Sequence, residues 1–203
     1  MRLVCYNIHK GMDEFRRVTL LQLIKYLKSL DADVICLQEV LYYQFNMMKL
    51  ILKMDGVFAI HVHNKKMKFG ICILSKEKII KSNHILLTSK KEQRGILSID
   101  RENEVIINTH LGLDSEERKT QISEILNFAK NKGKNIIICG DFNEENINLS
   151  SYKDVAKYLF EDRKATFNKW RIDYIFCSKV TKVKSYQVDQ VFYSDHFPIM
   201  IEM

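Results

Sequence analysis

The chain has 203 residues, of which 46% are hydrophobic, and this is enough to build one substantial core. Seven glycines and one proline exclude a collagen-like or proline-rich chain, and no apolar run approaches the roughly 20 residues that a membrane-spanning helix needs. The formal net charge of +7 favours polyanionic partners, although a lysine-rich composition also serves solubility.

The five cysteines stand singly inside apolar runs and form no close pairs of the zinc or thioredoxin kind. This pattern predicts buried, reduced thiols in a cytoplasmic protein, with no disulfide framework. The N-terminus has neither the length nor the cleavage pattern of a signal peptide. We therefore expect a cytoplasmic monomer with a single domain over residues 1–203 and no transmembrane segment.

Apolar runs and helical spacing predict the secondary structure in chain order. Strands are expected over residues 3–6, 34–37, 57–62, 69–74, 79–87, 95–100, 105–109, 135–139, 171–176, 182–188 and 197–201. Helices are expected over residues 17–30, 42–54, 115–130 and 151–159. Hairpin tips are expected at residues 64–66 and 101–104. Because strand–helix–strand units alternate with hairpins, the sheets should be mixed, and two packed sheets covered by helices fit best. No dinucleotide-binding or P-loop motif follows a strand.

Polar residues interrupt the apolar runs where the strands end or begin. The clearest case is the segment Ile136–Asn143, in which three isoleucines and a cysteine run directly into Gly-Asp-Phe-Asn. If the last strands run antiparallel to the others, eight side chains meet at one edge of the sandwich. These are Asn7, Glu39, His110, Asp141, Asn143, Asp173, Asp195 and His196.

Each of these residues, taken alone, has an ordinary structural explanation. Glu39 could be a surface carboxylate, His110 a hydrogen-bonded structural histidine, and Asp173 a partner of Arg171 on the same strand. The asparagines could cap turns. Structural roles alone account poorly for eight such residues that all lie at strand ends on one edge of the sandwich. We therefore expect a site for metal-assisted cleavage of phosphoesters.

The same segments carry a family resemblance. In order they are Tyr-Asn-Ile-His-Lys-Gly, Leu-Gln-Glu-Val, Thr-His-Leu, Gly-Asp-Phe-Asn, Arg-Ile-Asp-Tyr-Ile-Phe and Ser-Asp-His-Phe-Pro, and they run from Tyr6 to Pro198. This ordered set resembles the endonuclease/exonuclease/phosphatase superfamily, which has the fold of deoxyribonuclease I, and small bacterial metal-dependent hydrolases in particular. The resemblance implies an α/β fold: a four-layered sandwich in which two mixed β-sheets pack face to face and are flanked by helices.

The resemblance also implies how a metal ion and a phosphate would be bound. Asn7 and Glu39 would hold Mg²⁺ or Mn²⁺, with Asp195 as a second or shared ligand, because hard cations prefer oxygen ligands. Asn143 would bind the phosphate and help to place the attacking water. His110 would donate a hydrogen bond to a phosphate oxygen.

The remaining implied roles concern proton transfer and charge. Asp141 would orient or deprotonate the attacking water. Asp173 would accept a hydrogen bond from His196 and raise its basicity, so that the imidazolium contacts the phosphate in the transition state. Arg94 could add a phosphate contact, although a surface arginine before a strand is the more ordinary interpretation.

Together these implications predict a Mg²⁺- or Mn²⁺-dependent phosphodiesterase, most simply a nuclease acting on DNA or RNA. The alternatives are a phosphatase or phosphodiesterase for lipid head groups or small phosphoesters, a tyrosyl-DNA phosphodiesterase-like enzyme and, last, a non-catalytic binding protein. The residues around Asn7 and Glu39 differ from those typical of the abasic-site endonuclease branch, which argues against abasic-site repair.

Overall fold

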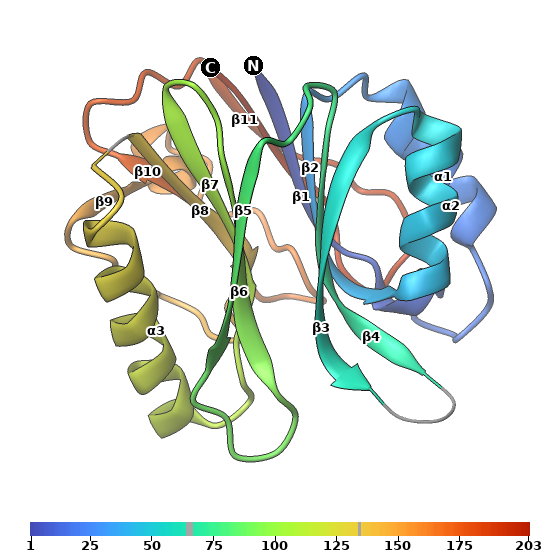
Figure 1. Cartoon of the computed structure of the whole chain (residues 1–203), viewed down its shortest axis with the longest axis horizontal. Coiled ribbons are helices and arrows are strands. Elements are labelled where there is room, and N and C mark those ends of the chain that lie inside the picture. Colours follow the sequence, from blue (N-terminus) through green and yellow to red (C-terminus); the bar gives the residue numbers. More distant parts are fainter. Residues whose placement is uncertain (64–66, 134) are drawn as a thin grey trace.

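In the computed structural model, which describes residues 1–63, 67–133 and 135–203, the chain forms two six-stranded sheets packed face to face (Figure 1). The first sheet consists, in spatial order, of β11 (Ser185–Val188), β12 (Ile199–Glu202), β1 (Arg2–Asn7), β2 (Val34–Leu41), β4 (Lys68–Ser75) and β3 (Asp55–His63). The second consists of β5 (Lys81–Leu87), β6 (Arg94–Asp100), β7 (Glu104–His110), β8 (Asn135–Asp141), β10 (Asp173–Ser178) and β9 (Tyr152–Asp154). The β1–β2 and β7–β8 pairs are parallel and their neighbours antiparallel, which confirms the predicted mixed sheets.

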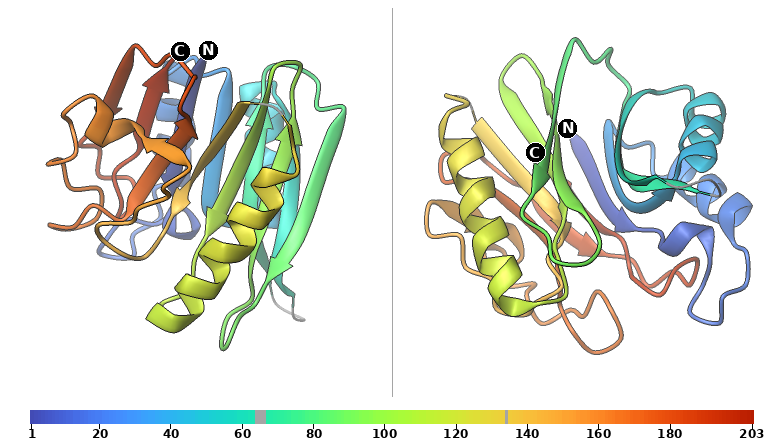
Figure 2. Two further views of the ribbon diagram at one scale, coloured as in Figure 1. Left: turned by 90° about the vertical axis from the view of Figure 1, so that its left-hand side faces the viewer. Right: turned by 60° about the horizontal axis from the view of Figure 1, so that its bottom comes forward.

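Helices cover both outer faces of this sandwich (Figure 2). α1 (Leu20–Ser29) and α2 (Tyr42–Leu52) pack on the first sheet, and α3 (Ser115–Lys130) packs on the second. Of the two short helices, η1 (His9–Gly11) follows β1, and α4 (Val155–Tyr158) adds Val155 and Ala156 to the core between the sheets. The sequence of strand β8 shows why it lies in an inner layer. Its Ile137 and Cys139 face the core between the sheets, whereas Ile136 and Ile138 belong to the core that α3 covers. Because both faces of the strand are buried, every position in this run is apolar.

A buried polar pair joins the two sheets. Gln38 of β2 and Asn108 of β7 are both fully buried, and the Gln38 amide donates to Asn108 Oδ1 at 2.6 Å. Asn108 Nδ2 in turn donates to the backbone carbonyls of Leu37 and Cys72. A satisfied buried network of this kind fixes the position of one sheet relative to the other. Gln38 directly precedes the predicted site residue Glu39, and Asn108 lies two residues before His110.

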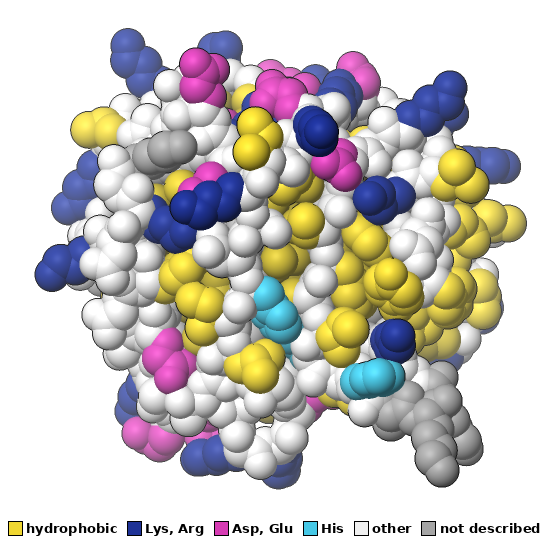
Figure 3. Space-filling model, viewed as in Figure 1, with side chains coloured by type: hydrophobic (Ala, Val, Ile, Leu, Met, Phe, Trp, Pro, Cys, Tyr) yellow, Lys and Arg dark blue, Asp and Glu magenta, His cyan; other side chains and the backbone are white. Residues whose placement is uncertain are grey.

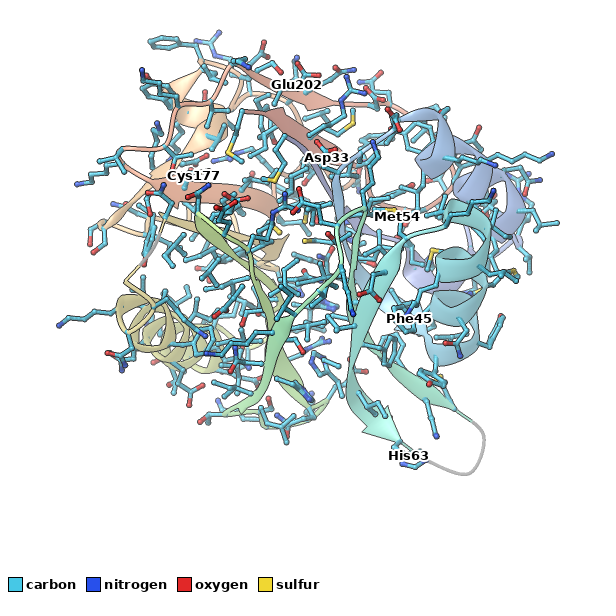
Figure 4. All side chains as sticks on the ribbon, turned by 45° about the horizontal axis from the view of Figure 1, so that its top comes forward. Asp33, Phe45, Met54, His63, Cys177 and Glu202 are labelled. Carbon is cyan, nitrogen blue, oxygen red and sulfur yellow. The ribbon has the colours of Figure 1, made fainter. Side chains whose placement is uncertain are left out.

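The two chain ends lie together at one end of the sandwich (Figure 1). The Arg2 side chain bonds Glu202, and its backbone nitrogen donates to Asp33 Oδ2 at 2.7 Å. Figure 4 shows both acidic side chains at this end, and it shows Phe45 between α2 and the first sheet. The carboxyl ends of β1, β2, β7 and β8 lie at the opposite end of the molecule, where the polar residues gather.

Two edge strands, β3 of the first sheet and β5 of the second, lie side by side with apolar side chains between them (Figure 3). They expose Ile60, Ile85 and Leu86. Among the described residues, no helix is both long enough and apolar enough to cross a membrane. All five cysteines are buried and free, as predicted.

Most predicted elements occur, with two differences of substance. Strand β2 does not end at Leu37, as predicted, but continues to Leu41 through a register shift between Leu37 and Val40. The segment predicted as a helix over residues 151–159 begins as strand β9, because it pairs with the edge of β10, and only its second half is helical. The predicted hairpin tip at residues 64–66 lies outside the described residues, whereas the hairpin at residues 101–104 is confirmed.

Candidate active site

Strand pairing places Asp141 at the centre of the candidate site. Asp141, at the end of β8, lies in register with His110 on one side and with Asp173 on the other. Because β10 runs antiparallel to β8, the first residue of β10 meets the last residue of β8. The antiparallel pairing of β12 with β1 brings Asp195 and His196, which precede β12, to the same edge. The expectation about strand directions is therefore confirmed.

Gly140 is required for this arrangement. Its φ of +152° lies outside the conformations that other residues adopt readily, and a Cβ atom here would lie 2.1 Å from the backbone oxygen of Thr109. The missing side chain allows β8 to approach β7 closely at the point where both strands end. The glycine of Gly-Asp-Phe-Asn thus brings Asp141 beside His110.

The carboxylate of Asp141 is buried and receives donors from several elements. Its Oδ2 accepts from Asn7 Nδ2 at 3.0 Å, and its Oδ1 accepts from the backbone nitrogen of Asn143 at 2.8 Å. His110 Nε2 and His196 Nε2 lie 3.5 and 3.6 Å from Oδ2. Burial raises the pKa of Asp141 to about 6, and the nearby His196 only partly offsets this effect.

His196 and Asp173 form a buried, charged pair. His196 Nδ1 lies 2.9 Å from Asp173 Oδ2, and because the carboxylate can only accept, Nδ1 carries the proton. Burial alone would lower the pKa of His196, but the charges of Asp173 and Asp141 outweigh it and raise the pKa to about 10. His196 is therefore an imidazolium at neutral pH, with its Nε2–H directed toward Asp141. The Phe167 ring packs on it, 4.6 Å between centroids.

His110 is neutral because it is buried and because it lies beside the charge of Arg94. Burial and then Arg94 lower the pKa of His110 well below its usual value. The Arg94 guanidinium, which has only donors, lies 3.3 Å from His110 Nδ1, so that this nitrogen accepts and Nε2 carries the proton. Arg94 is only 6% exposed and also bonds Glu92, so the ordinary interpretation as a surface arginine is wrong. Its predicted phosphate contact stays a prediction.

The three predicted metal ligands lie on the first-sheet side of Asp141. Asn7 is adjacent in register to Gln38, the residue before Glu39. Glu39 has a φ of +53° within the irregular part of β2, a conformation that is costly for a glutamate, and its Oε2 lies 3.2 Å from Lys10 Nζ. Ser194 Oγ bonds both the Asn7 backbone oxygen and Asp195 Oδ1. All three residues offer oxygen atoms.

Asn143 takes a left-handed conformation with a φ of +51°, directly after β8. Its side-chain nitrogen donates to the Leu111 backbone oxygen at 2.8 Å, and its backbone nitrogen bonds Asp141. The residue is therefore held at the site edge by both neighbouring strands. Its predicted contact with phosphate stays a prediction.

A buried acidic and histidine cluster is present at the centre of the site. Asp141, Asp173 and His196 each offer a ligand atom within 4.8 Å of the others. The His196–Asp173 bond and the protonated imidazole argue against this triad as a cation site, because a histidine ligand must be neutral. The oxygen atoms of Asn7, Glu39 and Asp195 suit a hard cation better.

Sequence reasoning missed three supporting residues. Lys10 balances the charge of Glu39, and its motif, His-Lys-Gly, was a signal that pointed to it. Thr166 accepts from the backbone nitrogens of Ile172 and Asp173 and so fixes the start of β10. Phe167 covers His196. The last two lie in a polar segment with no regular pattern, so only the tertiary structure identifies them.

Comparisons with solved structures identify the fold, although no curated protein sequence matches the chain. An endonuclease/exonuclease/phosphatase family protein from Bacteroides thetaiotaomicron superposes with a TM-score of 0.85 at 19% identity, over 99% of this chain and 96% of that one. A mannosyl-6-phosphatase from Bacteroides thetaiotaomicron gives 0.81 at 18% identity, over 100% and 98%. The human Nocturnin catalytic domain, with a bound sulfate anion, gives 0.79 at 21% identity, over 99% and 92%.

These likenesses show a shared fold, and the family model provides the assignment. The model of the Endonuclease/Exonuclease/phosphatase family matches residues 4–196, which is nearly the whole chain. This range includes every residue of the candidate site. The chain therefore belongs to the Endonuclease/Exonuclease/phosphatase family.

Proposed function

We propose that this protein is a divalent-metal-dependent phosphodiesterase that hydrolyses nucleic acid. One observation carries the proposal: a buried carboxylate, Asp141, lies between His110 Nε2 and His196 Nε2, at 3.5 and 3.6 Å. Neutral His110 and charged His196 both direct an Nε2–H toward it. Such a set can accept a proton from water and donate to developing negative charge in the same space.

In this proposal Asp141 is the general base. Its pKa of about 6 lies near neutrality, where a base both exists in its deprotonated form and retains affinity for a proton. The separations of 3.5 and 3.6 Å from the two histidines are longer than good hydrogen bonds, so both donors are available to phosphate oxygens. Asp173 keeps His196 protonated throughout, which makes His196 a charge-stabilising donor to the phosphate.

Asn7, Glu39 and Asp195 would hold Mg²⁺ or Mn²⁺. The donor set fits such an ion, because amide and carboxylate oxygens are its preferred ligands and few are needed when water completes the shell. The left-handed backbone of Glu39 supports this role, since strained conformations of this kind gather at functional sites. When bound, the ion would withdraw negative charge from the phosphate.

The formal charge of +7 supports a polyanionic substrate and hence nucleic acid. A second candidate is a phosphatase for small phosphomonoesters, favoured by the likeness over the full chain to a mannosyl-6-phosphatase. The fold itself does not choose between them, because one fold serves several substrates.

Hydrolysis of bis-p-nitrophenyl phosphate, single-stranded oligonucleotides and sugar phosphates tests the proposal, each with Mg²⁺, with Mn²⁺ and with EDTA. We expect metal-dependent turnover of the first two that EDTA abolishes. His196→Ala and Asp141→Asn should each lower turnover by about 10² to 10⁴-fold. Turnover that survives EDTA, or losses under tenfold in both variants, would refute the mechanism. A preference for sugar phosphates would favour the second candidate.

A further inference from the structure

A small pocket beside the candidate active site is bounded by two exposed aromatic rings. Its volume is about 230 Å³, and it is lined by Asp13, Glu14, Phe15, Arg17, Phe192 and Ser194. Ser194 joins the pocket to the site, because its Oγ donates to the Asn7 backbone oxygen at 2.8 Å and lies 3.1 Å from Asp195 Oδ1. Figure 2 (right) shows the two loops that form it, the blue loop after η1 and the red loop before β12.

The loop that carries Phe15 is built around a buried carboxylate. Asp13 is 3% exposed and accepts from the backbone nitrogens of Phe15 and Arg17 and from Arg17 Nε. A backbone bridge between Met12 and Val18 closes the loop. This construction leaves the Phe15 ring 68% exposed, with the Arg17 guanidinium 5.0 Å from its centre. The ring is therefore presented to solvent from a preorganised loop.

Phe192 is presented in a comparable way from the opposite loop. Its ring is 66% exposed and packs edge-on against Phe197, with 5.6 Å between centroids. Asp189 anchors the loop, since its side chain accepts from the Tyr26 hydroxyl at 2.8 Å and its backbone oxygen from the nitrogen of Val191. Exposing two large apolar rings in fixed positions at one pocket indicates a binding surface.

The charges of the lining identify the occupant. Asp13 and Arg17 neutralise each other at 2.6 Å, which leaves Glu14 and no excess of positive charge for a phosphate. A quaternary ammonium group is disfavoured, because the Arg17 guanidinium already makes the cation–π contact with the Phe15 ring that such a ligand would use. The occupant that fits this lining is therefore an uncharged planar ring. Its size is limited as well, because the pocket is smaller than the roughly 300–1,000 Å³ typical of sites for drug-sized ligands.

We propose that this pocket, between Phe15 and Phe192, binds a nucleobase next to the scissile phosphate of single-stranded nucleic acid. This inference rests on the proposed function and extends it to a base-binding subsite. A base outside a duplex offers a planar face that stacks on aromatic side chains with little sequence preference. The chain would then select unpaired over paired substrate, because a stacked and paired base cannot enter.

Binding of a short thymidine oligonucleotide that contains 2-aminopurine tests this in EDTA, where no turnover is needed. Stacking in the pocket should quench the 2-aminopurine fluorescence on binding to the wild-type protein. Phe15→Ala and Phe192→Ala should each weaken binding by about 5- to 150-fold. A control, Phe160→Ala, removes an aromatic ring that is 91% exposed and lies outside the pocket, and it should leave binding unchanged.

A second oligonucleotide with tetrahydrofuran in place of each base separates stacking from backbone charge. The wild-type protein should bind it at least tenfold more weakly, and the Phe15→Ala and Phe192→Ala variants should bind both oligonucleotides alike. Equal wild-type affinity for the two, or variants that behave like the Phe160→Ala control, would overturn the inference. Displacement of the oligonucleotide by phosphorylcholine more readily than by thymidine 5′-monophosphate would overturn it as well. Hydrolysis of bis-p-nitrophenyl phosphate reports on the proposed function separately.

Discussion

Replacing Asp173 by asparagine tests how the candidate site sets the charge of His196. The change removes one negative charge 2.9 Å from His196 Nδ1 and keeps the size of the side chain. Strand β10 pairs with β8 through backbone groups, so it should still form in the Asp173→Asn variant. The variant thus alters the protonation of His196 with the smallest change of shape that the chain allows.

The size of the effect follows from the pKa of His196. A rise from the ordinary 6.5 to about 10 corresponds to about 5 kcal/mol in favour of the imidazolium. The negative charges of Asp173 and Asp141 supply this free energy and outweigh the opposing effect of burial, and Asp173 contributes more than Asp141. Since one charged partner at this range shifts a pKa by about 1–3 units, the variant should bring His196 to a pKa between about 7 and 9.

The assay is a nuclear magnetic resonance titration of the histidine rings, with hydrolysis of bis-p-nitrophenyl phosphate measured over the same pH range. Wild-type His196 should stay protonated beyond about pH 9, whereas the Asp173→Asn variant should titrate below it. Turnover at about pH 8 should fall by about 10²-fold or more. Asp154→Asn is the matched control, because Asp154 of the neighbouring strand β9 pairs with Arg171, just before β10, at 2.7 Å.

Two results would refute the reasoning. If His196 keeps a pKa above about 9 in Asp173→Asn, then Asp173 does not supply the charge that protonates it. If Asp154→Asn lowers the pKa of His196 as much, the effect comes from loosening of the sheet. If the first result comes with a loss of stability, Asp173 has a structural role only.

Three further predictions concern stability and metal binding. Gly140→Ala should lower the free energy of unfolding in urea by about 3 kcal/mol or more, because its Cβ would meet the Thr109 backbone oxygen, whereas Gly133→Ala, which meets nothing within 4 Å, should cost about 1 kcal/mol. Glu39→Gln should weaken Mn²⁺ binding in calorimetry by about tenfold or more, and an unchanged affinity would exclude Glu39 as a ligand. The pKa of His196 in the folded protein is raised above 6.5, so the stabilisation by its charged form is complete below pH 6.5 and is lost toward pH 10. The free energy of unfolding in urea should therefore be about 3 kcal/mol lower at about pH 9.5 than at pH 6.5. A His196→Gln variant that shows the same pH dependence would assign it to other groups.

The sequence alone determined the layers and the identity of most of the strands. The run Ile136–Cys139 is apolar at every position because both faces of this strand are buried. Such an unbroken apolar run is visible in the local sequence, without knowledge of which segments pack against it. Local chemistry also placed α3 at the predicted residues Ser115–Lys130, where Asp114 caps the helix by accepting from the Glu117 backbone nitrogen. Polar residues at strand ends were visible for the same reason, since they break an apolar pattern.

Only the tertiary structure decided how those residues act on one another. Glu39 reaches its position through a bulge inside β2, which depends on pairing with β4 and leaves no local mark in the sequence. Arg94 looks like a surface residue along the chain, yet the packing of β6 against β7 buries it beside His110 and fixes that ring's proton. Protonation depends on distances between residues far apart in sequence, as with Asp173 and His196. Composition and order could therefore name the participants of the site, but only the packed sheets set their charges.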